Sequence, residues 1–137
     1  MIRLTEKTQQ DFLNKEWIEK MIEANVPMKD NKYWLIDIDG ITYVGMESDK
    51  AMAEDMGHSV YPTYTLSELF YKLGEWHPEY KALRFWKDAP FYFAQYEKAP
   101  DNSPFTQYHE YPICAAAALL INCVKNGFGC VNNISDK

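Results

Sequence analysis

The sequence predicts an α+β fold in which two antiparallel β-hairpins, each only marginally stable alone, join into one four-stranded sheet covered by helices. Three observations lead to this prediction. Apolar residues recur at helical spacing near both ends of the chain. Two other stretches show the residue pattern of paired strands on either side of a short turn. Proline and glycine separate these segments. We expect one domain over residues 1–128, with the order α-β-β-α-α-β-β-α, three main helices and one short helix, followed by a mobile tail over 129–137.

The first helix is expected over residues 8–25. Thr8 resembles an N-cap with Asp11 three residues later, and Pro27 ends the pattern. The apolar residues at helical spacing are Phe12, Leu13, Trp17, Ile18, Met21 and Ile22.

The stretch YWLIDIDGITYVG predicts a hairpin. Asp39-Gly40 is a preferred pair for a two-residue type I′ turn, in which both residues have positive φ. The resulting pairs are Ile38–Ile41, Ile36–Tyr43, Asp37–Thr42 and Leu35–Val44. We expect the apolar side that carries Ile36 to face the core and Asp37 to point away from it.

Two helices should follow. A short one is expected between Ser48 as N-cap and Gly57 near its end. A second begins at Thr65, because Glu68 stands three residues later and completes a capping box, and we expect it to end at Gly74.

The second half continues with a hairpin and a last helix. The strands ALRFW and FYFAQYE flank a turn of Asp88, Ala89 and Pro90. A polar loop with two prolines comes next. Pro112 then opens a helix that runs to Asn126 and is capped by Gly127.

The charge of the chain limits its partners. It has 14 Lys and Arg against 20 Asp and Glu, a net charge of −6, and no basic stripe. Because Lys and Arg supply most affinity for phosphate backbones and anionic lipids, we expect no nucleic-acid and no membrane partner. The first residues lack the apolar segment of a signal peptide and the three cysteines are an odd number, so we expect reduced thiols and a cytoplasmic location.

No pattern of metal ligands is found. A calcium loop that began at Asp37 would need a glutamate where Ser48 stands. The histidines and cysteines lack the short spacings of zinc ligands; they are His58, His77, His109, Cys114, Cys123 and Cys130. We therefore expect no metal and no other cofactor.

A catalytic role is not favoured, and no catalytic residue is assigned. Cys114 stands near the start of the last helix, where a thiol pKa can be lowered, and His109 precedes it by five residues. Small buried cysteines are nevertheless common in apolar stretches. An enzyme or small-ligand-binding protein stays an alternative, and would need a pocket in which His58, His77 or His109 meets Cys114 or the acids of residues 47–55.

The second hairpin offers a candidate partner-binding surface. Its strands are aromatic on both sides, so the set that does not face the core would lie on the far face. This set is Arg84, Trp86, Tyr92 and Tyr96. Trp, Tyr and Arg are the residues enriched at interface hot spots. The alternative is that both faces are covered and this set forms a second core layer.

Two resemblances add to these patterns. The Ala-rich stretch CAAAALLINCV resembles the closing helix of double-stranded RNA-binding domains. That family has a lysine-rich motif before the helix and three strands, whereas this chain has TQYHEYPI there, with Glu110 and no lysine, and two expected strands. RNA binding is therefore not expected.

The order YPTYTLSEL, LRFWKDAPFYFAQYE and YPICAAAALLINCVKNG, over residues 61–127, resembles small uncharacterised proteins of bacterial phages and other mobile elements. This resemblance implies an accessory protein that acts in a bacterial cell and assigns no site residue. We expect a non-catalytic protein-binding protein, one version being an inhibitor of a host defence system. A self-assembling structural protein, such as a homodimer through the outer face of the second hairpin, is a further alternative.

Overall fold

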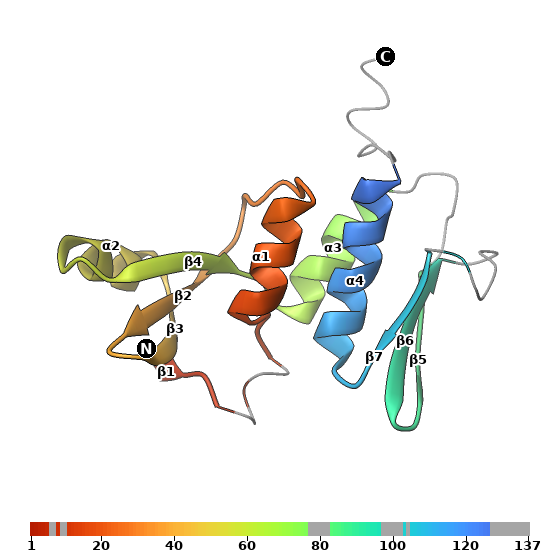
Figure 1. The fold of residues 1–137 in the computed structure, drawn as a ribbon, viewed down its shortest axis with the longest axis horizontal. Coiled ribbons are helices and arrows are strands. Elements are labelled where there is room, and N and C mark those ends of the chain that lie inside the picture. The colour runs from red at the N-terminus through yellow and green to blue at the C-terminus, as the bar shows by residue number, and fades with distance from the viewer. Residues whose placement is uncertain (6–7, 9–10, 77–82, 97–102, 104, 127–137) are drawn as a thin grey trace, which may run out of the picture.

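The computed structural model describes residues 1–5, 8, 11–76, 83–96, 103 and 105–126 (Figure 1). Its helices are α1 (Lys15–Glu23), α2 (Glu47–Asp55), α3 (Leu66–Trp76) and α4 (Pro112–Lys125). Its strands are β1 (Ile2–Arg3), β2 (Tyr33–Ile38), β3 (Ile41–Gly45), β4 (Ser59–Thr63), β5 (Leu83–Asp88), β6 (Phe91–Tyr96) and β7 (Thr106–His109). The predicted α+β class is confirmed, and the expected tail over 129–137 lies outside the described residues.

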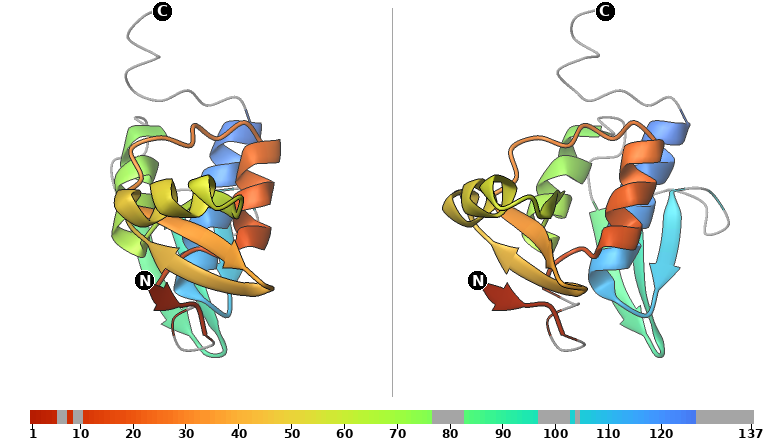
Figure 2. Two further views of the ribbon diagram at one scale, coloured as in Figure 1. Left: turned by 90° about the vertical axis from the view of Figure 1, so that its left-hand side faces the viewer. Right: turned by 60° about the vertical axis from the view of Figure 1, so that its left-hand side comes forward.

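The strands form two antiparallel sheets instead of the single one expected. The first has the order β1-β3-β2-β4 and the second the order β5-β6-β7. Figures 1 and 2 show α1, α3 and α4 between the two sheets, with α2 on the far side of the first. The prediction of one four-stranded sheet was wrong, because the helices separate the hairpins and each hairpin pairs instead with strands that the sequence did not reveal.

The first hairpin has the predicted turn and register. Asp39 has φ 51° and Gly40 has φ 80°, as a type I′ turn requires. The pairs are Trp34–Gly45, Leu35–Val44, Ile36–Tyr43, Asp37–Thr42 and Ile38–Ile41. A local turn signal was therefore sufficient to fix which residues share a face.

The assignment of the two faces was wrong. Leu35 and Val44 belong to the main hydrophobic cluster, whereas Ile36, also fully buried, lies on the opposite face, where α2 packs. Asp37 shares the face of Leu35. There its Oδ1 accepts a hydrogen bond of 2.8 Å from Thr42, and its Oδ2 lies 3.6 Å from Nζ of Lys15. Both faces of this hairpin are covered, so apolarity alone could not identify the core side.

Helix α1 begins seven residues later than predicted. Its N-cap is Asn14, whereas Thr8 accepts a hydrogen bond from the backbone N–H of Thr5 in a separate turn. Leu13 explains the difference. Its N–H donates to the carbonyl of Tyr64 at 3.1 Å, and its own carbonyl accepts from Thr63 Oγ1 at 2.6 Å. These contacts with the end of β4 occupy the backbone groups that a longer helix would need.

Helix α2 lies where the sequence placed a short helix, but its cap differs. The N-cap is Met46, whose N–H donates to Asp49 at 2.9 Å, and Ser48 lies inside the first turn. Gly57 follows the helix with φ 81°, as expected of a residue at a helix end.

Helix α3 has the predicted start and a different end. The Thr65 N–H donates to Glu68 at 3.0 Å, and the Glu68 N–H donates to Thr65 Oγ1 at 3.3 Å, which completes the capping box. Gly74 was expected to end the helix. It lies inside α3, which continues to Trp76.

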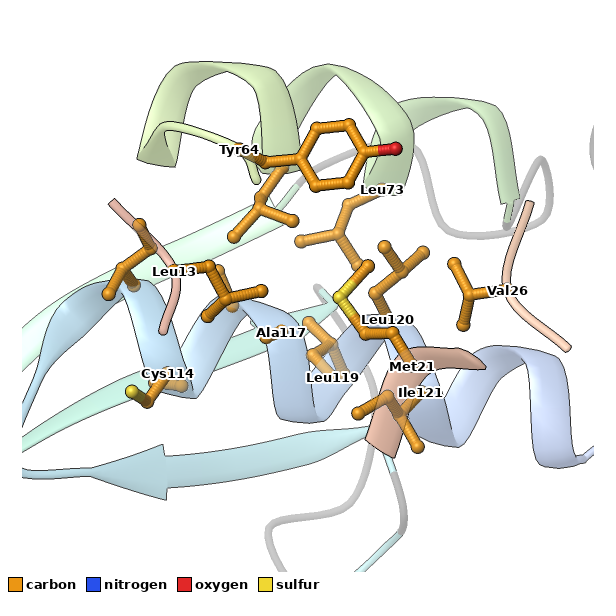
Figure 3. Packing of buried hydrophobic residues seen from close by; sticks show 14 of the residues in the cluster. Leu13, Met21, Val26, Tyr64, Leu73, Cys114, Ala117, Leu119, Leu120 and Ile121 are labelled. Carbon is orange, nitrogen blue, oxygen red and sulfur yellow. The ribbon is translucent and has the colours of Figure 1, made fainter. Parts of the chain in front are cut away.

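Helix α4 forms the centre of the core (Figure 3). It begins at Pro112, as predicted, with Asn126 as its C-cap; the predicted cap Gly127 lies outside the described residues. Its side chains are buried from Ile113 to Ile121 without interruption. It contacts α1 and α3 on one side and β6 and β7 on the other. Within the described part of the chain, no helix is long and apolar enough to cross a membrane.

The second hairpin gains a third strand from the predicted loop. β7 pairs with β6 along the edge opposite β5. The order α3-β5-β6-β7-α4 is therefore helix, three strands, helix, so the expectation of two strands was wrong. The lysines that the RNA-binding family carries before its last helix are still missing, since Glu110 and Tyr111 stand there.

Two glycine substitutions test the turn and the helix end. At both Gly40 and Gly74 an added Cβ would meet no atom within 4 Å, so only the backbone matters. We expect Gly40→Ala to lower the free energy of unfolding by about 1 kcal/mol, because its φ is positive. Gly74→Ala should raise it by up to about 1 kcal/mol, because alanine favours a helix interior. Urea denaturation measures both, and a loss of stability in Gly74→Ala would contradict its place inside α3.

Candidate functional site

The face of the second sheet that points away from α4 carries a cluster of aromatic side chains. We call it the outer aromatic face and define it by Arg84, Trp86, Phe91, Phe93 and Tyr108. Trp86 is paired with Phe93, and Phe93 with Tyr108, so these three residues cross all three strands on one side. Figure 1 shows α4 on one side of this sheet and no described helix on the other.

The rings of this face stack on one another. The Trp86 and Phe93 rings lie 5.2 Å apart at an interplanar angle of 7°. The Phe93 and Tyr108 rings lie 5.5 Å apart, and Phe91 meets the Tyr108 ring edge-on at 5.2 Å. Such contacts fix the side chains in a preorganised array, which lowers the entropy lost when a partner binds.

Arg84 supplies the positive charge of the outer aromatic face. Its guanidinium carbon lies 5.0 Å from the centre of the Trp86 ring. Its Nη1 donates to Oε1 of Gln95 at 3.4 Å. A planar guanidinium over an indole is held in place while its remaining N–H groups stay available to a carboxylate or carbonyl.

The array is partly open to solvent. Tyr108 is 59% exposed, and the rings of Trp86, Phe91 and Phe93 are half-buried. A partly exposed aromatic cluster on one side of a sheet marks a contact surface more often than a single exposed apolar residue does.

Two of the four residues predicted for this surface lie on the other face. Tyr96 is 2% exposed, and its hydroxyl donates to the carbonyl of Leu73 in α3. Tyr92 is paired with Lys87 and stacks on Phe85 on the inner face. Desolvation raises the pKa of the Tyr96 hydroxyl, as expected for a core residue. Of the predicted set, only Arg84 and Trp86 have the expected placement.

The pair of Cys114 and His109 does not have the properties of a nucleophile and its base. Cys114 is 2% exposed, and desolvation raises the pKa of its thiol to about 12. His109 accepts at Nδ1 from the Tyr111 N–H at 3.0 Å and meets the Trp17 ring edge-on at 5.6 Å. Desolvation lowers the pKa of its imidazole. These groups act in packing and in the turn that leads into α4.

The acids of residues 47–55 serve α2 itself. Glu47 accepts from the Trp34 indole N–H at 3.0 Å, and Asp49 caps the helix. Lys50 lies 3.6 Å from Glu47 and 3.7 Å from Glu54. His77 lies outside the described residues. His58 follows α2, and its backbone N–H donates to the carbonyl of Ala53 at 2.9 Å. Among the described residues, no hydrogen bond or ion pair joins His58 or His109 to Cys114 or to these acids.

One cavity of about 370 Å³ lies between α3 and the loop before β2. Its lining consists of Asp30, Lys32, Tyr64, Glu68, Tyr71 and Lys72. Lys72 donates to the carbonyl of Lys29 at 3.3 Å and lies over the Tyr64 ring, so it holds the loop against α3. No histidine or cysteine lines this cavity.

Over the residues that the structure describes, no three His, Cys, Asp or Glu side chains are placed to hold a metal ion. Comparison with protein-family models, with curated proteins and with solved structures gives no match to this chain.

The two buried thiols should resist alkylation while the protein is folded. Cys123 resembles Cys114, with a thiol that is fully buried and a pKa raised by desolvation to about 12. At about pH 8, such a group is thiolate in only ~10⁻⁴ of molecules. In a Cys130→Ser variant, we expect iodoacetamide to label both thiols only after denaturant is added, as measured by mass spectrometry. Rapid labelling of Cys114 in the native protein would show that the thiol is accessible.

Proposed function

We propose that this chain is a non-catalytic protein-binding protein and that its partner contacts the outer aromatic face. The observation that carries the proposal is the stacked array of Trp86, Phe93 and Tyr108 beside Arg84, on a sheet whose other face is buried against α4. Aromatic residues and arginine dominate the binding energy of protein interfaces, particularly where they form one contiguous cluster.

The overall charge supports a partner with a basic surface. A net charge of −6 creates a field that speeds the approach of positively charged proteins and repels acidic ones. The outer aromatic face itself is mainly apolar, so charge would steer the encounter while the rings supply affinity. The partner is then a protein with an apolar patch inside a basic surround.

The biological setting of the proposal is an accessory protein of a phage or mobile element. It depends on the resemblance of residues 61–127 to such proteins, and on that resemblance alone. Inhibition of a host defence protein is one role that fits, because an acidic protein can occupy a channel that normally binds nucleic acid.

A double substitution tests this proposal. Tagged wild-type protein and a Phe93→Ala/Tyr108→Ala variant are used to capture partners from a bacterial lysate. Alanine substitution of a hot-spot residue commonly costs about 1 kcal/mol or more of binding free energy. Removal of two stacked rings should therefore weaken binding at least ~tenfold. A protein retained by the wild type should therefore be lost from the variant.

The matched control is Tyr71→Ala. Tyr71 is 75% exposed on α3 and lines the cavity beside the loop before β2, so its removal deletes an exposed aromatic ring outside the outer aromatic face. Partner capture should survive this change, and thermal unfolding should show that all the variants are folded. The proposal is wrong if the double variant captures the same protein as strongly as the wild type does.

A further inference from the structure

Strand β5 lies at the edge of the second sheet. It pairs with β6 on one side, and no described strand pairs with it on the other. An edge strand presents backbone N–H and C=O groups that can bind another strand. Six residues, Leu83–Asp88, are available for such pairing.

Only some registers allow β5 to pair with a second copy of itself. In an antiparallel pair, alternate residues direct their N–H and C=O groups to the partner strand. Because β6 already binds one alternate set, only the other set can bind a new strand. A symmetric pairing must therefore place odd-numbered residues opposite odd-numbered ones and even opposite even, with the two-fold axis at one residue.

Charge selects among these axes. An axis at Arg84, Lys87 or Asp88 places that residue opposite its own copy and so opposes like charges. An axis at Leu83 or at Phe85 gives Asp88 no counter-charge, and the axis at Phe85 places Arg84 opposite Trp86. With the axis at Trp86, Arg84 lies opposite Asp88 of the second copy, and the reverse pair forms by symmetry.

We propose that a second copy of this chain pairs antiparallel with β5 about a two-fold axis at Trp86. Two Arg84–Asp88 ion pairs flank the contact between the two Trp86 side chains, and all these side chains lie on the side of the sheet that carries the outer aromatic face. The β5-β6-β7 sheets of the two copies then form one sheet of six strands, and the two outer aromatic faces become continuous. Arg84 and Asp88 are both exposed in the single chain, so neither must leave a buried site to form these pairs.

Charge reversal provides the test. In a dimer of the Arg84→Glu variant, each substituted residue lies opposite Asp88 of the other copy. In a dimer of the Asp88→Arg variant, each substituted residue lies opposite Arg84 of the other copy. Each single variant therefore places like charges opposite each other at two positions. We expect each to raise the dimer dissociation constant on the order of tenfold. The double variant Arg84→Glu/Asp88→Arg should recover the wild-type value, because it restores both pairs in reversed order.

A mixture of the two single variants gives the sharpest result. In a mixed dimer, Arg84→Glu supplies two acidic positions and Asp88→Arg supplies two basic ones, so both pairs are complementary. We expect the equimolar mixture to form heterodimers at least as tight as the wild-type dimer, as measured by sedimentation velocity and native mass spectrometry. A general loss of folding could not produce this recovery.

The control is Arg3→Glu, which makes the same change in charge at an exposed residue of β1 in the other sheet. It should leave the dissociation constant unchanged. The pairing is overturned if the wild type is monomeric up to about 1 mM, if the single variants dimerise as well as the wild type, or if their mixture dimerises no better than either alone.

The β5 pairing does not depend on the proposed function, and the two can fail separately. Partner capture is tested at Phe93 and Tyr108, which lie on the two strands away from the β5 edge. Dimer formation is tested at Arg84 and Asp88. A protein that captures its partner but stays monomeric would retain the first proposal and lose the second.

Discussion

The rest of the structure depends on the burial of α4 on every side. A helix that is apolar around its whole circumference must be covered in all directions. Here α1 and α3 cover one side, and β6 and β7 cover the other. The run of alanines from Ala115 to Ala118 lets these neighbours pack closely. Burial of α4 therefore determines which face of the second sheet is inside, and the outer aromatic face is the side that this packing leaves open.

Polar groups inside the core connect elements that are distant in sequence. The Tyr96 hydroxyl donates to the carbonyl of Leu73 and so connects β6 to α3. The Tyr64 hydroxyl donates to the carbonyl of Lys29 at 3.3 Å and so connects the segment before α3 to the loop before β2. Desolvation raises the pKa of both hydroxyls further above physiological pH, as expected for phenols inside a core. With the two thiols also protonated, these buried titratable groups contribute to packing and connectivity, and function is better sought on the surface.

Local signals in the sequence predicted local structure well. The Asp39-Gly40 turn fixed the register of the first hairpin, and the capping box at Thr65 fixed the start of α3. The strands β1, β4 and β7 were missed, because they are short and exist by pairing with distant strands. The late start of α1 was missed for a similar reason, since Leu13 is bound by residues some fifty positions away.

The candidate site was half predictable, and the reason is the geometry of the second hairpin. A two-residue turn at Ala89-Pro90 pairs Trp86 with Phe93, so an even-numbered residue of one strand shares its face with odd-numbered residues of the next. The length of the turn could have been inferred from the sequence, and it would have placed Tyr92 and Trp86 on opposite faces of the sheet. Tyr108 could not have been found in this way, because it joins the face only through β7. The outer aromatic face thus combines one local hairpin with a strand recruited from a polar segment, and only the folded sheet brings its rings together.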